Sequence, residues 1–79
     1  MNRKITPAQF IRLKVFAVGT QHEFADMLGY EQAHISRFEN GLPISRVAQD
    51  RIRELAKARD IEWDNNWFFE VPDHNANAA

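Results

Sequence analysis

The sequence TQHEFADMLGYEQAHISRFENG, residues 20–41, decides the fold of this chain. It contains a small residue, Ala25, then Gly29 four positions later and Ile35 six positions after that. Ala25 is small enough to let a second helix approach closely, and Gly29 can take the positive φ that ends a helix sharply. Ile35 would then fill the gap between the helices. This spacing predicts two short helices that cross over a tight turn.

Helix-boundary signals flank this turn on both sides. Thr20 and Glu23 have the spacing of a capping box, and Asn40 followed by Gly41 is a helix stop. We therefore expect the two helices over residues 21–28 and 32–39. Their buried side is completed by Phe24, Leu28 and Phe38.

Nine residues of this stretch stand where the pattern of one known family expects them: Gln21, Ala25, Leu28, Gly29, Gln32, Ile35, Ser36, Glu39 and Gly41. On these residues the stretch resembles the helix-turn-helix of the lambda-repressor/Cro-like (XRE) family. The resemblance is close over residues 20–41, holds in outline over residues 6–60 and says little about the last nineteen residues. It implies an all-α fold, a compact lambda-repressor-like domain of four to five helices, and a protein that binds double-stranded DNA.

The helix before this motif has its own start signal. Thr6 is an N-cap, Pro7 suits the first helical position, and Gln9 completes a capping box. The helix is expected to run from about residue 7 to residue 18. Its buried face is predicted to consist of Phe10, Leu13 and Ala17, widened by Phe16 or Val15.

A further helix is expected after the motif, over about residues 46–59, with Ser45 as its N-cap. Leu42 and Pro43 form the connector that leads to it. The apolar stripe of this helix is predicted to consist of Val47, Ala48, Ile52, Leu55 and Ala56.

The length of 79 residues predicts one small domain, over residues 1–71, and a disordered tail over residues 72–79, which have little to bury. The chain has no cysteine, which fits a cytoplasmic protein. No segment approaches the roughly 20 apolar residues of a membrane span. We expect a cytoplasmic protein without membrane attachment, metal, cofactor or small-molecule ligand.

The net charge of −1 is unusual for a nucleic-acid binder, but the charges are unevenly distributed. Residues 1–20 carry four basic side chains and no acid, and residues 21–41 carry one base and four acids. Residues 42–60 carry five bases and three acids, whereas residues 61–79 carry four acids and no base. The acidic tail is therefore expected to face away from DNA.

Four of the nine aromatic residues lie in one short segment near the C-terminus: Trp63, Trp67, Phe68 and Phe69. Such a segment is too short to fold alone. Asp64 could cap a short helix through Glu70, and an extended arm is the alternative because aromatic residues suit strands. We predict that the four aromatic residues form a dimer interface, with packing on the core of a single chain as the competing possibility.

The second helix of the motif is expected to enter the major groove, where each base pair has its own pattern of donors and acceptors. Positions two or three residues from the buried Ile35 point outward. The predicted base contacts are Gln32, Ala33, Ser36 and Arg37. Gln32 could pair with an adenine edge, Arg37 with guanine, and Ala33 with a thymine methyl group.

Other residues are predicted to contact phosphates. Gln21 starts the first helix of the motif, where backbone amides and the helix dipole attract anions. The remaining phosphate candidates are His34, Asn40, Ser45 and Arg46.

Two positions depart from the family pattern. The resemblance implies an ion pair between Glu39 and a cation of the first helix. We expect that cation to be Lys14, in which case the bidentate fork of the usual arginine would be lost. Glu31 stands where the family prefers Ser or Thr as N-cap, and it would bring negative charge near phosphate.

The leading hypothesis is a homodimeric repressor that reads an inverted repeat, because a two-fold dimer places two half-sites about one helical turn apart. The alternative is an antitoxin-type or adaptor protein that binds a protein partner, such as a toxin, through the aromatic acidic segment. An enzyme is not expected. His22 and Asp26 share a helix face, but with no cysteine they form no metal or nucleophile constellation.

Overall fold

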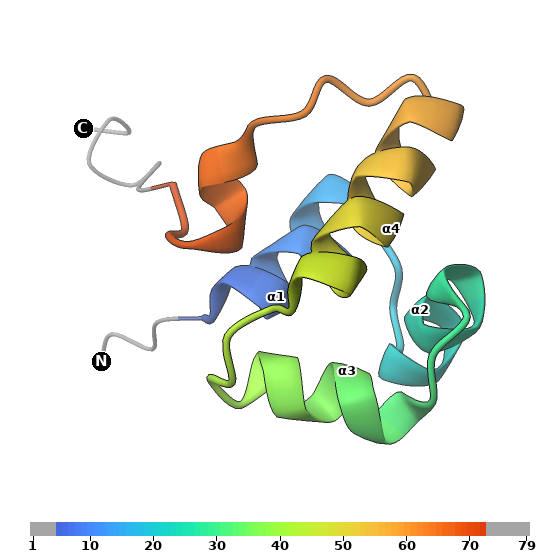
Figure 1. The fold of residues 1–79 in the computed structure, drawn as a ribbon, viewed down its shortest axis with the longest axis vertical. Helices are drawn as coiled ribbons and strands as arrows, with labels where there is room; N and C mark the ends of the chain where they lie inside the picture. Colours follow the sequence, from blue (N-terminus) through green and yellow to red (C-terminus); the bar gives the residue numbers. More distant parts are fainter. Residues whose placement is uncertain (1–4, 73–79) are drawn as a thin grey trace.

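The computed structural model describes residues 5–72, and within them every regular element is helical. The elements are α1 (Pro7–Phe10), η1 (Ile11–Val15), α2 (Gln21–Leu28), α3 (Gln32–Glu39), α4 (Arg46–Ala58) and η2 (Asn65–Phe68). Figure 1 shows α3 along one edge of the molecule and η2 beside α1. The predicted all-α fold is confirmed. The tail predicted over residues 72–79 lies, apart from Pro72, outside the described residues.

The helix-turn-helix forms as its boundary signals predict. The side chain of Thr20 accepts a hydrogen bond from the Glu23 amide at 3.1 Å, which caps α2. Gly29 ends α2 with φ of 76°, and the Tyr30 amide donates to the Ala25 carbonyl at 2.8 Å. Ala25 and Ile35 are buried between the helices. Both predicted spans, 21–28 and 32–39, agree with the structure.

The first helix differs from the prediction in length and in its buried face. After α1 the chain forms a π-turn, in which the Phe16 amide donates to the Ile11 carbonyl at 3.0 Å. The helix ends before Ala17, whose φ is 56°, rather than at residue 18. Because hydrogen bonds from i to i+5 widen the turn, Ile11 and Phe16 share the buried face. Leu13, predicted to be buried, is 40% exposed.

Helix α4 begins after Ser45, whose hydroxyl accepts a hydrogen bond from the Ala48 amide at 3.2 Å. It ends at Ala58, one residue before the predicted end. Ala48, Ile52 and Ala56 form its buried stripe. Val47 was wrongly placed in that stripe: it is 55% exposed, because it lies about 100° around the helix from Ala48.

The C-terminal segment forms a single 3-10 turn, η2, in place of the longer predicted helix or the alternative extended arm. Asp64 caps it as expected, accepting from the Asn66 amide at 2.9 Å. The Trp67 ring packs edge-on against Phe10, with centroids 5.7 Å apart, and Phe68 is only 4% exposed. This segment therefore completes the core of a single chain.

Candidate nucleic-acid interface

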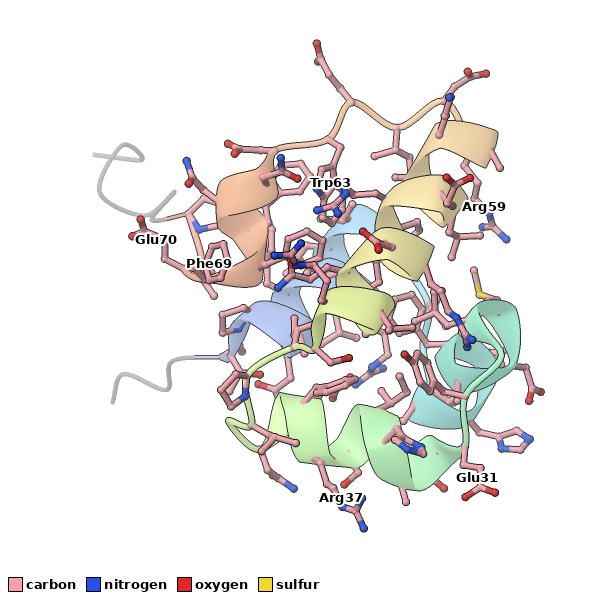
Figure 2. The ribbon with its side chains drawn as sticks, in the orientation of Figure 1. Glu31, Arg37, Arg59, Trp63, Phe69 and Glu70 are labelled. Atoms are coloured by element: carbon pink, nitrogen blue, oxygen red, sulfur yellow. The ribbon has the colours of Figure 1, made fainter. Side chains whose placement is uncertain are left out.

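Helix α3 has one buried face and one open face. Ile35, Phe38 and Glu39 are buried against the rest of the domain. Gln32, Ala33 and Arg37 are exposed, and Ser36 is half-buried at the margin of the open face. In Figure 2 the Arg37 side chain projects away from the body of the molecule. The four predicted base-contacting residues thus lie on a helix that a groove can receive.

A buried ion pair holds α3 against the first helix. The Arg12 guanidinium donates to both carboxylate oxygens of Glu39, from Nε at 2.6 Å and from Nη2 at 3.0 Å. Arg12 also donates to the Val18 carbonyl at 3.1 Å. The predicted partner, Lys14, was wrong: it is exposed, because the π-turn places position 12 on the buried side. The bidentate fork expected to be lost is therefore present.

The same carboxylate starts a chain of hydrogen bonds that reaches the open face of α3. Oε1 of Glu39 accepts from the Gln21 side-chain amide at 2.9 Å. The Gln21 oxygen in turn accepts from the Gln32 amide at 3.1 Å. Because Glu39 is buried and fixed by Arg12, Gln32 has a defined orientation. This coupling was missed from the sequence, where Gln21 was predicted only as a phosphate contact.

Of the other predicted phosphate-contacting residues, His34 lies on α3, and Asn40, Ser45 and Arg46 follow it in the chain. His34, Asn40, Ser45 and Arg46 are all exposed. The His34 ring lies 5.1 Å from the Tyr30 ring, centroid to centroid. Asn40 ends α3, and Ser45 and Arg46 begin α4, so three of these residues follow the C-terminal end of α3.

A side chain of α4 stabilises the turn between α2 and α3, which sets the orientation of α3. Nη1 of Arg51 donates to the Leu28 carbonyl at 3.1 Å and to the Gly29 carbonyl at 3.3 Å. The Arg51 guanidinium also lies 4.8 Å from the centre of the Tyr30 ring. These contacts satisfy carbonyl groups at the end of α2, so the crossing of α2 and α3 is supported from outside the motif.

The four aromatic residues predicted to form a dimer interface do not share one environment. Trp63 and Trp67 are half-buried, and Phe68 is enclosed by its own chain. Phe69 is 70% exposed, and Figure 2 shows it on a different side of the molecule from Arg37. Beside Phe69 lies an apolar groove of about 290 Å³, with Leu42 and Pro43 on its other wall. Of these four aromatic side chains, Phe69 is therefore the most accessible to a partner.

Within residues 5–72 no group of three or more His, Cys, Asp or Glu side chains is placed to hold a metal ion. None of the helices described there is long and apolar enough to cross a membrane. His22 and Asp26 are 3.7 Å apart on the exposed surface of α2.

A family model described as helix-turn-helix matches residues 19–64, which include α2, α3 and α4. No curated protein and no solved structure matches the chain.

Proposed function

We propose a function on the premise that this chain belongs to the Cro/C1-type helix-turn-helix (XRE) family, whose members are DNA-binding transcription regulators. The proposal is that the chain acts as a homodimeric repressor. Each copy inserts α3 into the major groove, and the pair reads the two halves of an inverted repeat. Occupancy of such a site blocks transcription and requires no further chemistry.

The main support for base recognition by α3 is the chain of hydrogen bonds from Glu39 through Gln21 to Gln32. One amide hydrogen of Gln32 is bonded to Gln21, which leaves the second hydrogen and the oxygen for a ligand. That pair matches the N7 acceptor and N6 donor of adenine. A glutamine fixed in this way loses little side-chain freedom on binding, so it discriminates between bases more sharply than a mobile one.

Arg37 and Ala33 supply the other proposed base contacts. Arg37 has no salt bridge to any other described residue, so its planar fork can engage O6 and N7 of guanine. Ala33 presents a methyl group beside Gln32 and suits the thymine methyl. Ser36, at the margin of the open face, is proposed to contact a base edge at the border of the site.

Phosphate contacts are proposed for Gln21, His34, Asn40, Ser45 and Arg46. Gln21 lies at the amino end of α2, where backbone amides and the helix dipole also favour a phosphate. Arg46 begins α4, which follows the C-terminal end of α3. Such contacts fix the register of the protein on DNA and carry little sequence information themselves.

The dimer is proposed to form through the face that carries Phe69. Phe69 is 70% exposed and Leu42 is 52% exposed, on either side of the apolar groove. The occupant that we favour is a second copy of the chain, with Phe69 of each copy in the groove of the other. This face is lateral to the open face of α3 (Figure 2), so a two-fold axis here leaves both reading helices uncovered.

A gel-shift competition tests DNA reading. Gln32→Ala and Arg37→Ala are each expected to weaken binding to operator DNA about 5- to 150-fold, since a good bidentate contact contributes about 1–3 kcal/mol. Arg59→Ala is the matched control, because it removes the same charge from the far end of α4 (Figure 2). The proposal fails if scrambled DNA competes as well as operator DNA.

One alternative function uses the same exposed Phe69. With Glu62, Asp64 and Glu70 nearby and no base in residues 61–72, this segment suits a basic protein partner, as in an antitoxin or adaptor. Sedimentation of the protein alone separates the two proposals. A dimer that Phe69→Ala dissociates supports the repressor, and a monomer at all concentrations supports the partner-binding alternative.

A further inference from the structure

Glu31 occupies the position immediately before α3, at the end of the helix that is proposed to enter the groove. Its backbone has the extended conformation of an N-cap residue, but its side chain makes no capping hydrogen bond. Figure 2 shows the Glu31 carboxylate projecting away from the body of the molecule, on the same side as Arg37. The carboxylate is thus placed beside the proposed base contacts.

No described residue forms a salt bridge with this carboxylate. Within residues 5–72 the salt bridges join Arg12 to Glu39, His22 to Asp26 and Arg53 to Asp50, and none involves Glu31. Serine or threonine at this position would cap α3 better than glutamate. The favourable interaction of the carboxylate with the dipole of α3 requires no particular orientation of the side chain, so the carboxylate oxygens stay available to a ligand.

We propose that Glu31 reads a base: its carboxylate accepts a hydrogen bond from the N4 amino group of a cytosine in the major groove. The inference rests on the proposed DNA-reading function and adds a specificity-determining residue to it. The N-terminal residues of a recognition helix are those that reach base edges. An ionised carboxylate can only accept hydrogen bonds, and cytosine presents a donor in the major groove.

The same charge acts against the other bases. Guanine presents two acceptors, N7 and O6, and thymine presents the O4 acceptor and a methyl group, so both oppose a carboxylate. Adenine presents a donor at N6 but an acceptor at N7 beside it. Glu31 also lies close to where phosphates run, so its charge weakens binding to DNA in general. Specificity is a difference of affinities between sites. Only a site with cytosine opposite Glu31 gains a hydrogen bond that offsets the repulsion between its carboxylate and the phosphates.

Selection of random DNA sequences by the full chain tests this inference. The wild-type protein is expected to select cytosine over guanine about tenfold at one position of each half-site, next to the base pair read by Gln32. Glu31→Ala should remove the preference at that position and leave the rest of the consensus intact. Glu31→Gln should shift the preference towards adenine, because a side-chain amide matches the adenine edge.

Glu54→Gln is the matched control, since it removes one exposed carboxylate from α4 and should leave the consensus unchanged. Circular dichroism spectra of the variants verify that each is folded. An unchanged consensus in Glu31→Ala, with affinity raised evenly for all sequences, would overturn the inference and leave Glu31 as a charge that only repels phosphate. A wild-type protein that selects no sequence would overturn the proposed function itself. A wild-type consensus without cytosine beside the Gln32 position contradicts the Glu31 inference alone.

Discussion

The buried ion pair between Arg12 and Glu39 supports the exposed face of α3 that is proposed to contact DNA. It joins the first helix to the end of α3, and through Gln21 it orients Gln32. The family resemblance implied a pair of this type, but we assigned Lys14 as its cation, which is wrong. Two cations lie two positions apart in the first helix, at 12 and 14, and only the π-turn determines which of them is buried.

Removal of one partner from this pair should be costly. Arg12→Ala leaves the Glu39 carboxylate buried without its cation, and we expect the free energy of unfolding to fall by about 3–5 kcal/mol. Lys14→Ala removes an exposed cation and should change it by less than about 0.5 kcal/mol. Urea denaturation of both variants measures the difference. Equal effects of the two substitutions would show that the pair does not hold the helices together.

Gly29 is a second single residue on which the fold depends, because the turn between α2 and α3 requires its φ of 76°. Gly29→Ala should destabilise the domain by about 1–2 kcal/mol, the cost of a left-handed conformation for a residue with a Cβ atom. The added Cβ would also lie 3.4 Å from Nη1 of Arg51.

Gly19→Ala is the control for this substitution, since a Cβ atom at Gly19 meets nothing within 4 Å and its φ is not in the left-handed range. Thermal unfolding followed by circular dichroism should show a lower melting temperature for Gly29→Ala than for Gly19→Ala. The reverse order would mean that the turn does not depend on glycine.

At the scale of elements, α2 and α3 could be predicted to the residue because their signals are local. Thr20, Gly29 and Asn40 each set a boundary through the adjacent backbone, whatever the rest of the fold does. The buried face of the first helix could not be predicted in the same way. A regular period of 3.6 residues indicated Leu13 and Ala17, but the π-turn shifts the register to Ile11 and Phe16.

The C-terminal segment shows the same division between local and non-local information. The Asp64 cap was predictable because it bonds to a residue two positions away. Which of the aromatic side chains are buried and which are exposed could not be predicted. It depends on contacts with Phe10 and Phe16, which lie more than 45 residues earlier in the chain. The structure places Phe68 in the core and leaves Phe69 at the surface.

This division gives a prediction for two adjacent residues. Phe68→Ala should lower the free energy of unfolding by about 3–5 kcal/mol, as for other buried phenylalanines. Phe69→Ala should leave the stability of the single chain within about 0.5 kcal/mol but dissociate the proposed dimer. Urea denaturation at low protein concentration and sedimentation at high concentration separate the two effects. A dimer that survives Phe69→Ala would place the contact elsewhere.

For the whole molecule, the distribution of charge limits how DNA is held. The open face of α3 and its flanks present Arg37 and Arg46, against the acids Glu23, Asp26 and Glu31 on the same motif. Because the described residues place only these two cations there, this part of the chain should contribute little affinity for DNA of arbitrary sequence. We therefore expect the proposed base contacts to contribute a large share of the binding free energy.

Salt dependence tests this distribution. Arg46→Ala should weaken binding to operator and scrambled DNA by the same factor and reduce the slope of log K against log salt by about one, as expected for the loss of one phosphate contact. Its consensus sequence should stay unchanged. A changed consensus would assign Arg46 to a base instead of a phosphate.

In the proposed dimer, α3 of two joined copies reads an inverted repeat. Selection of random DNA by the wild-type protein, followed by sequencing, tests it most directly. We expect two half-sites of opposite orientation, with centres about one helical turn apart, and the loss of defined positions in Gln32→Ala and Arg37→Ala. A pool without an enriched sequence, or a single half-site that both variants still select, would contradict it.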